Sequence, residues 1–453
     1  MKWIGKLIDS ITERGREIWQ QENPAGSSSI RSIDRDCAEL LTRKGDAVAM
    51  AIARHILARY RQLNEHGKLD FFTYLLNLRP DYQALSIQFK SLETDESPQV
   101  YQQVMQDLNI GRRTLFELLN VPGEGTRALI DMRADLLPLL KQDPRLRMVD
   151  NDLQSILQSW FNRGFLEFHS IDWNTPAAIL EKLIQYEAVH EISDWSDLKR
   201  RLADDRDCFA FFHPSLPGEP LIFVQVAYVD DISDSISPFL DHQLPVSDPT
   251  TARAAIFYSI SNCQAGLKGI SFGNFLIKQV VQHIQGVHPN IRWFSTLSPM
   301  PGLANAVRSG VLDEAQLVFL AGNQAKDIRQ LASDQKLSTL LVTEYQNLDN
   351  DQPHVRDWLE AVGLHYLSQV KKMDGPYDPV ARFHLSNGAS IFRINPFANA
   401  RNYGLKSSAG LMVNYLYDLD RVEMNHEQFK QTGAIDILKT ARKQGRRLKG
   451  AAA

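Results

Sequence analysis

The sequence is poor in cysteine and contains no long apolar segment. Among its 453 residues there are only three cysteines, Cys37, Cys208 and Cys263, and no two of them form a C-x-x-C pair. This pattern excludes a disulfide framework and a cysteine zinc site, and it indicates a reducing compartment. No uninterrupted apolar run reaches the length of about 18 residues that a transmembrane helix needs. We therefore expect no transmembrane helix and no membrane partner.

Neither sign of charge predominates in the composition. Fifty basic residues against 54 acidic ones give a net charge of −4. A nucleic-acid-binding protein usually has a strong basic excess, so we expect no nucleic-acid partner. Hydrophobic residues make up 43% of the chain and charged residues 23%, which excludes a disordered chain or a fibre. At roughly 100–200 residues per domain, the length predicts about two to four domains.

The N-terminal third of the chain predicts helices. Between Asp36 and Leu63, apolar residues recur at helical spacing and give one apolar face. Proline and glycine turn signals separate the later segments, and short connections between amphipathic helices predict a bundle. These segments are Phe71–Leu78, Tyr82–Leu92, Val100–Leu108, Arg113–Leu119, Arg127–Leu140 and Asp152–Phe161. Because we find no catalytic constellation here, we expect an architectural or oligomeric role.

The pattern changes after Trp160, where strands and helices alternate. Helices are predicted at Pro176–Tyr186, Asn274–Gln285 and Val355–Leu367, and Asp230–Thr250 is predicted to be a long surface loop. The predicted strands are Cys208–Phe212, Leu221–Val229, Ala254–Ile260, Ile291–Ser295, Ala381–Leu385, Ile391–Ile394 and Leu411–Tyr417. This mixture predicts an α/β or α+β domain.

A glycine-bearing loop is the first candidate binding site. The segment Ala254–Val281 predicts a strand, then a loop with Gly266, Gly269 and Gly273, then an amphipathic helix. Glycines allow a close approach to a ligand, and amides at a helix N-terminus attract an anion such as a pyrophosphate. The spacing matches neither G-x-G-x-x-G nor the P-loop. From the residues alone, phosphate binding and a plain structural turn both remain open.

The same loop contains a match to the nucleophile elbow of serine hydrolases. Residues 269–273 read Gly-Ile-Ser-Phe-Gly, which fits G-x-S-x-G. The elbow needs a strand that runs directly into the turn, and the predicted strand stops near Ile260. We therefore disfavour a serine hydrolase.

Ser298 is the second candidate. It follows a predicted buried strand and begins a Ser-Pro-x-Pro-Gly turn that ends at Gly302. Proline fixes the backbone φ angle, so the turn is stiff and holds Ser298 at the end of the strand. Binding residues often occupy such positions, but taken alone the hydroxyl more often bonds only within its own turn.

His384 is the third candidate. It lies near the end of the predicted strand Ala381–Leu385, in a hairpin expected to turn at Asn387 and Gly388. Histidine is the usual side chain for proton transfer near neutral pH. Taken alone, a single histidine on a strand could also be structural.

Together these three segments resemble the malonyl-CoA decarboxylase family. The resemblance rests on Phe-Tyr-Ser-Ile-Ser with Gly-Leu-x-Gly-Ile-x-x-Gly-x-Phe-Leu-Ile-Lys, on Phe-Ser-x-Leu-Ser-Pro-x-Pro-Gly, and on Ala-x-Phe-His-Leu-x-Asn-Gly-Ala. Further similar segments, in the order of the family, are Trp160–Leu166, Tyr186–His190, Pro217–Leu221 and Gly410–Tyr415.

The resemblance implies an α+β multidomain chain. Residues 1–158 would form an all-helical bundle used in assembly, and residues 159–453 an α/β catalytic domain of the acetyltransferase (GNAT) type. The catalytic serine of the family falls on Ser298 and its catalytic histidine on His384. Some members carry an acidic residue where this chain has Ser271. The malonyl-CoA contacts would be Ser298 and His384 together with Lys268, Gly269, Ile270, Ser271, Phe272, Gly273 and Asn274.

The implied reaction is the decarboxylation of malonyl-CoA to acetyl-CoA and carbon dioxide. Loss of carbon dioxide leaves a thioester enolate, which needs prearranged donors at its oxygen and a proton at its α-carbon. We assign His384 as the proton donor and Ser298 as its hydrogen-bonding, proton-accepting partner. The thioester is itself the electron sink, so we expect no metal and no organic cofactor.

The resemblance also implies a homo-oligomer, which we expect to be a homotetramer built as a dimer of dimers. The N-terminal sequence lacks the apolar core of a signal peptide and a convincing transit peptide, and the chain ends without Ser-Lys-Leu. We therefore expect a cytoplasmic protein.

Two other functions fit an acyl-CoA-binding chain. An acyl-CoA N-acyltransferase would form product from acetyl-CoA and an amine, and would leave malonyl-CoA alone unchanged. A non-enzymatic malonyl-CoA sensor would bind malonyl-CoA without releasing carbon dioxide.

Overall fold

The computed structural model describes residues 2–22, 33–43, 45–79, 82–94, 97–107, 111–270, 275–373 and 375–446. Within this part, the chain forms two compact units, each made of several chain segments. The first, called here the helical unit, contains Met1–Glu167, Phe212–Leu221 and Gln264–Gly273. The second, called here the sheet unit, contains Phe168–Phe211, Ile222–Cys263 and Asn274–Ala453.

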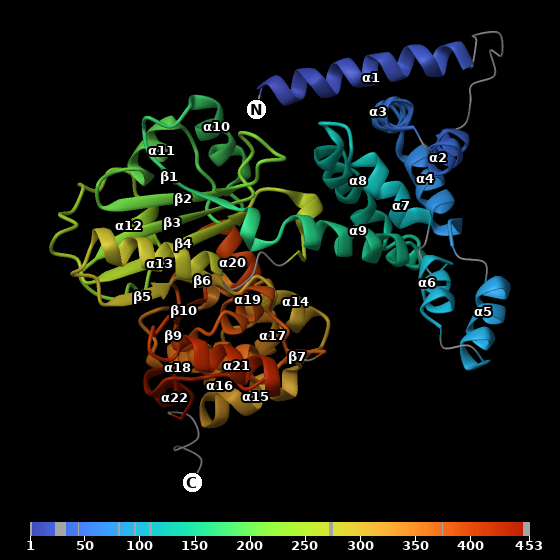
Figure 1. Cartoon of the computed structure of the whole chain (residues 1–453). Coiled ribbons are helices and arrows are strands. Elements are labelled where there is room, and N and C mark those ends of the chain that lie inside the picture. Colours follow the sequence, from blue (N-terminus) through green and yellow to red (C-terminus); the bar gives the residue numbers. More distant parts are fainter. Residues whose placement is uncertain are drawn as a thin grey trace. The chain divides into compact units, whose positions relative to one another are not determined.

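The helical unit carries the first helices of the chain, coloured blue to cyan in Figure 1. The predicted apolar stretch Asp36–Leu63 is divided between α2 and α3, because extended backbone at Gly45 starts a new helix with Asp46 in its first turn. The helices are α1 (Lys2–Glu22), α2 (Ile33–Thr42), α3 (Asp46–Arg61), α4 (Glu65–Asn77), α5 (Tyr82–Thr94), α6 (Pro98–Asp107), α7 (Gly111–Leu119), α8 (Gly125–Leu139) and α9 (Arg147–Trp160).

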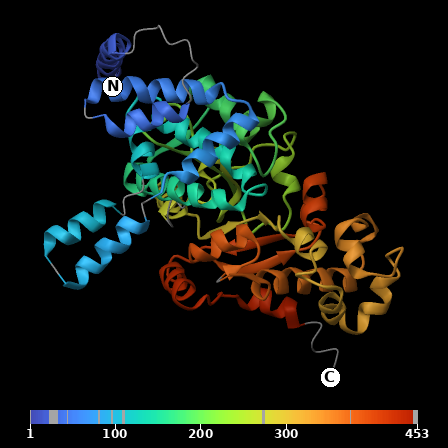
Figure 2. The ribbon, with the colours of Figure 1, turned by 90° about the vertical axis from the view of Figure 1, so that its right-hand side faces the viewer.

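An apolar core holds these helices together. It is formed by side chains of α2, α3, α4, α7, α8 and α9, and Phe71, Phe72 and Phe116 are fully buried in it. Full burial of each such side chain contributes about 1.5–3 kcal/mol. The hairpin of α5 and α6 extends away from the other helices of the unit (Figure 2) and leaves Ile87 and Tyr101 exposed.

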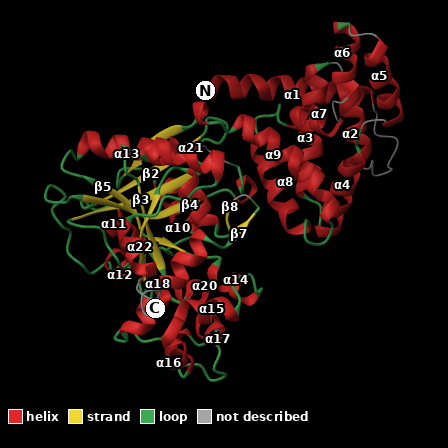
Figure 3. Ribbon diagram, turned by 90° about the horizontal axis from the view of Figure 1, so that it is seen from below, coloured by secondary structure: helices red, strands yellow, loops and turns green. Residues whose placement is uncertain are grey.

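The sheet unit is built on one mixed sheet, which forms a single twisted layer with helices packed on it (Figure 3). Its strand order is β1-β2-β3-β4-β5-β10-β6, and β9 pairs with β10. Strands β4 and β5 run parallel, whereas β2–β3, β3–β4, β5–β10 and β9–β10 are antiparallel. The strands are β1 (Glu167–Ile171), β2 (Arg206–Phe212), β3 (Ile222–Val229), β4 (Ala254–Asn262), β5 (Trp293–Thr296), β6 (Ser298–Pro299), β9 (Ser390–Asn395) and β10 (Met412–Leu416). A separate pair joins β7 (Lys371–Lys372) to β8 (Gly375–Pro376).

Thirteen helices accompany the sheet in the described residues. They are α10 (Ala177–Tyr186), α11 (Trp195–Arg201), α12 (Ser237–Leu240), α13 (Phe275–Val287), α14 (Leu303–Arg308), α15 (Glu314–Ala321), α16 (Ala325–Arg329), α17 (Leu337–Val342), α18 (Pro353–Ser368), α19 (Pro379–Ser386), α20 (Asn402–Ser408), α21 (Val422–Thr432) and α22 (Lys439–Arg446).

The predicted mixture of strands and helices after Trp160 is confirmed. Six of the predicted strands correspond to β2, β3, β4, β5, β9 and β10, and the three predicted helices to α10, α13 and α18. The sequence did not predict β1, whose side chains are largely exposed.

The predicted strand at Ala381–Leu385 and its hairpin are wrong. The segment is helix α19, since the Asp378 side chain accepts hydrogen bonds from the first free amides and Pro379 occupies the first turn. The helix ends at Asn387, and Gly388 follows with a φ of +85°, as is common after a helix. A β-carbon at Gly388 would lie 1.9 Å from the backbone oxygen of Val422, so only glycine fits there.

The prediction of a surface loop at Asp230–Thr250 is wrong for its first half. Ile232, Ile236 and Phe239 are buried in an apolar cluster with residues of β4 and β10, and α12 lies within this segment. The abundance of Asp, Ser and Pro in this segment is typical of a surface loop, so the composition did not predict that these apolar residues are buried. No helix in the described ranges is long and apolar enough to cross a bilayer.

Candidate functional site

The structure brings Ser298 and His384 together although they are 86 residues apart in the chain. Ser298 lies on β6, which pairs with β10, and His384 lies in the last turn of α19. The distance between Ser298 Oγ and His384 Nε2 is 3.2 Å, and both side chains are buried. This separation allows a hydrogen bond between a hydroxyl and an imidazole.

Hydrogen bonds on both sides of this pair determine which imidazole nitrogen carries the proton. The Ser298 hydroxyl donates to Thr296 Oγ1 over 2.9 Å, which leaves its oxygen to accept from Nε2–H of His384. On the other side, Nδ1 of His384 lies 2.8 Å from the hydroxyl of Tyr417, which also bonds the side chain of Asn387. All these contacts are satisfied when Tyr417 donates to Nδ1 and the proton of His384 sits on Nε2.

The pair lies in an apolar environment that keeps His384 uncharged. Burial lowers the pKa of His384 from 6.5 to about 3, because the imidazolium form would lose its hydration. The ring stacks on Tyr415 with 4.7 Å between centroids. Burial also raises the pKa of Tyr417 well above its usual value. The site therefore holds a neutral imidazole between two hydroxyl groups at physiological pH.

Asp378 connects the two segments that carry Ser298 and His384. Its Oδ1 accepts from the amides of Val380 and Ala381 at the start of α19. Its Oδ2 accepts from the amide of Gly302, at the end of the Ser298 turn, and from the hydroxyl of Tyr366. Burial raises the pKa of this carboxyl group, although all four hydrogen bonds oppose the shift. One buried side chain thus fixes the α19 start relative to the serine turn.

Only part of the predicted malonyl-CoA segment can be located. Lys268, Gly269 and Ile270 follow the short 3₁₀ helix η3 (Ala265–Leu267) in the helical unit. Ser271, Phe272, Gly273 and Asn274 lie outside the described residues. The order strand, glycine loop, helix agrees with β4, η3 and α13. Because β4 ends at Asn262 and η3 intervenes, no strand runs directly into Gly269, as a nucleophile elbow would require.

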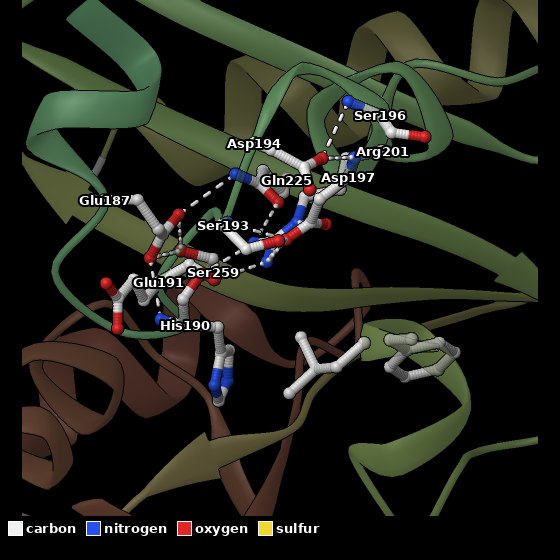
Figure 4. Close-up of polar contacts among 12 residues, drawn as sticks. Glu187, His190, Glu191, Ser193, Asp194, Ser196, Asp197, Arg201, Gln225 and Ser259 are labelled. Carbon is white, nitrogen blue, oxygen red and sulfur yellow. Dashed lines mark hydrogen bonds and ion pairs between the residues drawn. The ribbon is translucent and has the colours of Figure 1, made fainter. Parts of the chain in front are cut away.

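A second buried polar cluster surrounds Glu187, at the end of α10 (Figure 4). Its carboxylate accepts hydrogen bonds from Ser259 and Ser261 of β4 and from Gln225 of β3. The same carboxylate accepts from the amides of Val189 and His190. These bonds fasten the Tyr186–His190 turn, one of the family-like segments, to two central strands.

Arg201 of α11 completes this cluster (Figure 4). It donates to Asp197 and to the carbonyl oxygens of His190 and Glu191. The imidazole of His190 is buried, and burial together with the charges of Arg201 and Arg401 lowers its pKa to about 3. The cluster therefore contains a second histidine that stays neutral in the folded protein.

The described residues offer no metal centre. No group of three or more His, Cys, Asp or Glu side chains is placed there to bind a metal ion. A buried serine–histidine pair instead suits an enzyme that transfers a proton or stabilises an oxyanion.

Comparison with known proteins identifies the family. The malonyl-CoA decarboxylase C-terminal domain matches residues 164–452, and the malonyl-CoA decarboxylase N-terminal domain matches residues 78–161. The chain belongs to the malonyl-CoA decarboxylase family, which confirms the resemblance seen in the sequence.

Individual relatives agree with this assignment. The crystal structure of malonyl-CoA decarboxylase from Rhodopseudomonas palustris is 39% identical, has a TM-score of 0.83, and covers 91% of this chain and 98% of that one. The corresponding structure from Agrobacterium vitis is 38% identical with a TM-score of 0.78, covering 91% and 99%. The mitochondrial malonyl-CoA decarboxylase of Rattus norvegicus is 36% identical over 328 residues, which span 69% of this chain and 66% of the rat protein.

The two buried histidines predict a loss of stability in mild acid. Between pH 6.5 and about 3, the unfolded chain binds a proton at His190 that the folded chain does not. Stability is therefore complete above pH 6.5 and falls as the pH decreases, by up to about 1.4 kcal/mol per pH unit for each such histidine. The substitution His190→Gln should reduce the loss of unfolding free energy between pH 7 and 5 by about 1–2 kcal/mol. Urea unfolding at both pH values measures this, and equal losses in variant and wild type would contradict the assignment.

Proposed function

We propose that this chain decarboxylates malonyl-CoA to acetyl-CoA and carbon dioxide. The observation that carries the proposal is the Ser298–His384 hydrogen bond in a member of this family, at the two positions where the resemblance puts the catalytic residues. The curated relative named above carries the same activity in its name.

The reaction breaks the bond between the malonyl carboxylate and the α-carbon. The electron pair moves into the thioester, which gives an enolate and free carbon dioxide. The carboxylate must stand out of the thioester plane, so that the breaking bond overlaps the carbonyl π system. The enolate oxygen then needs a hydrogen-bond donor, and the α-carbon needs one proton.

In the proposed mechanism, His384 supplies that proton from Nε2. A neutral imidazole that lost only this proton would become an anion, which burial disfavours. The Tyr417 hydroxyl lies 2.8 Å from Nδ1 and can pass its own proton there in the same step. His384 then stays neutral and changes tautomer, and Tyr417 recovers a proton from solvent after the product has left the site. Asn387, which bonds the Tyr417 hydroxyl, eases this step because that bond favours the anionic form of Tyr417.

In this mechanism, the Ser298 hydroxyl donates a hydrogen bond to the enolate oxygen. In the structure its hydroxyl donates to Thr296, and rotation about its side-chain bond would direct the same proton to a bound thioester. One well-placed oxyanion donor is worth about 3–4 kcal/mol of transition-state stabilisation. Ser298 also stays within reach of Nε2 and can exchange a proton with His384.

The sheet supports an acetyltransferase-type catalytic domain. The pair β4–β5 is parallel, whereas its neighbours β3–β4 and β5–β10 are antiparallel, and β4 leads into the glycine loop. We propose that Lys268, Gly269, Ile270, Ser271, Phe272, Gly273 and Asn274 contact the CoA part of the substrate. We also propose a helical assembly domain at residues 1–158 and a catalytic domain at residues 159–453. We further propose that the protein is a homotetramer and that it is located in the cytoplasm. No metal or organic cofactor enters the scheme.

Carbon dioxide release from malonyl-CoA tests the proposed function. Purified wild type should release carbon dioxide and acetyl-CoA in equal amounts. His384→Ala and Ser298→Ala should each lower kcat by at least about 100-fold, as expected for loss of a proton donor or an oxyanion donor. CoA binding, measured by calorimetry, should persist in both variants. The proposal would be contradicted by a folded wild type that binds malonyl-CoA but releases no carbon dioxide, and that result would favour a malonyl-CoA sensor. Product formed only with acetyl-CoA and an amine would favour an acyltransferase.

Asp378 should be required for turnover, because it connects the segments that carry Ser298 and His384. Asp378→Asn puts an NH₂ group against an array of hydrogen-bond donors, so α19 and the Ser298 turn lose their common anchor. We expect kcat to fall by about 10-fold or more, because small displacements of catalytic groups are costly. The matched control is Asp194→Ala, which removes the helix-capping aspartate of α11. It should lower the melting temperature without lowering kcat, and equal effects of the two variants on kcat would reject the role of Asp378.

A further inference from the structure

The turn that leads into the proposed CoA segment is bound by side chains of the helical unit. Residues 264–270 belong to that unit, together with α8 and α9. Three carbonyl oxygens of this turn, those of Gly266, Lys268 and Gly269, accept hydrogen bonds from two side chains of these helices. The inference below rests on the proposed function, in which this turn leads into the CoA-contacting segment.

Arg133 of α8 makes the main contact. Its Nη1 donates to the carbonyl oxygens of Gly266 at 2.7 Å and Lys268 at 2.8 Å. Its Nε donates to Asp150 of α9 at 2.7 Å, and the Arg133 side chain is only 2% exposed. The ion pair with Asp150 orients the guanidinium, so that its remaining donors meet the turn. Charge-assisted hydrogen bonds of this kind are among the stronger ones in proteins.

Two further contacts fix the same turn. Gln154 of α9 donates to the carbonyl oxygen of Gly269 at 3.0 Å. The backbone of Gly266 lies directly against α8, because a β-carbon there would be 1.8 Å from the backbone oxygen of Ile130. The turn is thus held from α8 and α9 at Gly266, Lys268 and Gly269.

These contacts also set the direction of a backbone donor. The peptide bond is planar and trans, so the N–H of Gly269 points away from the Lys268 carbonyl group. Since that carbonyl group points at Arg133, the Gly269 N–H points away from α8. Gly269 has a φ of +80°, a conformation that glycine adopts without strain. A backbone amide of a glycine loop that points away from the Arg133 guanidinium suits an anionic ligand group.

We propose that Arg133 is a positioning residue for the recognition of CoA. It holds the 264–270 turn so that Lys268, Gly269 and Ile270 meet the pyrophosphate-bearing part of the substrate. Arg133 acts through the backbone of the turn and touches no reacting atom. Its loss should therefore weaken binding of substrates that carry the nucleotide portion of CoA, and should spare the chemistry at Ser298 and His384.

A second buried arginine of the same unit provides a matched control. Arg112 of α7 donates to Asp152 of α9 at 2.6 Å and to the carbonyl oxygen of Leu75 at 3.0 Å. Its side chain is 1% exposed, as deeply buried as Arg133. Both its partners belong to helices of the unit, and neither is part of the 264–270 turn. Arg112→Lys therefore measures how much stability is lost when a buried arginine–aspartate ion pair in these helices is disturbed.

The test compares malonyl-CoA with malonyl-pantetheine, which keeps the reacting group and lacks the nucleotide and its phosphates. For Arg133→Lys, loss of charge-assisted hydrogen bonds should raise the KM for malonyl-CoA about 10-fold or more, with kcat within about twofold of wild type. The kcat/KM for malonyl-pantetheine should stay within about twofold of wild type. Arg112→Lys should lower the melting temperature to a similar extent and leave both substrates unaffected.

Gln154→Ala is the second variant, since it removes one exposed hydrogen bond and leaves the buried pair intact. It should raise the KM for malonyl-CoA about threefold, again without an effect on malonyl-pantetheine. Unchanged KM values in both turn variants, or equal losses with both substrates, would overturn the role of Arg133. A wild type that turns over neither substrate would instead reject the proposed function itself.

Discussion

The buried imidazole of His384 is the group on which the proposed chemistry depends. Its low pKa follows from burial. A buried neutral ring needs a hydrogen-bond partner at each of its two nitrogens. Ser298 and Tyr417 provide these contacts, and Asp378 holds the two segments that carry Ser298 and His384. A neutral donor suits this reaction, because an enolate carbon is a strong base and needs no strong acid. In the proposed mechanism, the same burial would limit the water that competes for hydrogen bonds to the enolate oxygen.

Much of the fold was predictable from local patterns. The central strands carry continuous apolar runs, and proline and glycine mark the ends of many helices. At residues 378–388, a helix-start signal and a hairpin signal occur close together, and the helix forms. Asn387-Gly388 suggests a hairpin, but Asp378-Pro379, nine residues earlier, starts a helix, and Gly388 follows the end of that helix. The apolar residues of 232–239 were missed because the surrounding composition is typical of a loop.

The supporting residues of the candidate site were harder to predict. Ser298 and His384 could be proposed from resemblance, and the structure places their side chains 3.2 Å apart. Asp378, Tyr417 and Arg133 act through contacts with residues distant in the chain, which no local spacing encodes. The Asp-Pro helix start was a usable signal for Asp378, although only as a cap. Arg133 gave no signal, because a helical arginine is usually solvated and its partners in the turn are backbone atoms 133 and 135 residues away.

The protonation state of His384 tests the account most directly. Nitrogen-15 NMR of histidine-labelled wild type, with His384→Gln for assignment, distinguishes the two neutral tautomers from imidazolium. The account predicts a neutral ring protonated at Nε2, with no titration between pH 6 and 8. An imidazolium at pH 7, or a titration within that range, would contradict a buried neutral donor and would require a different source for the proton.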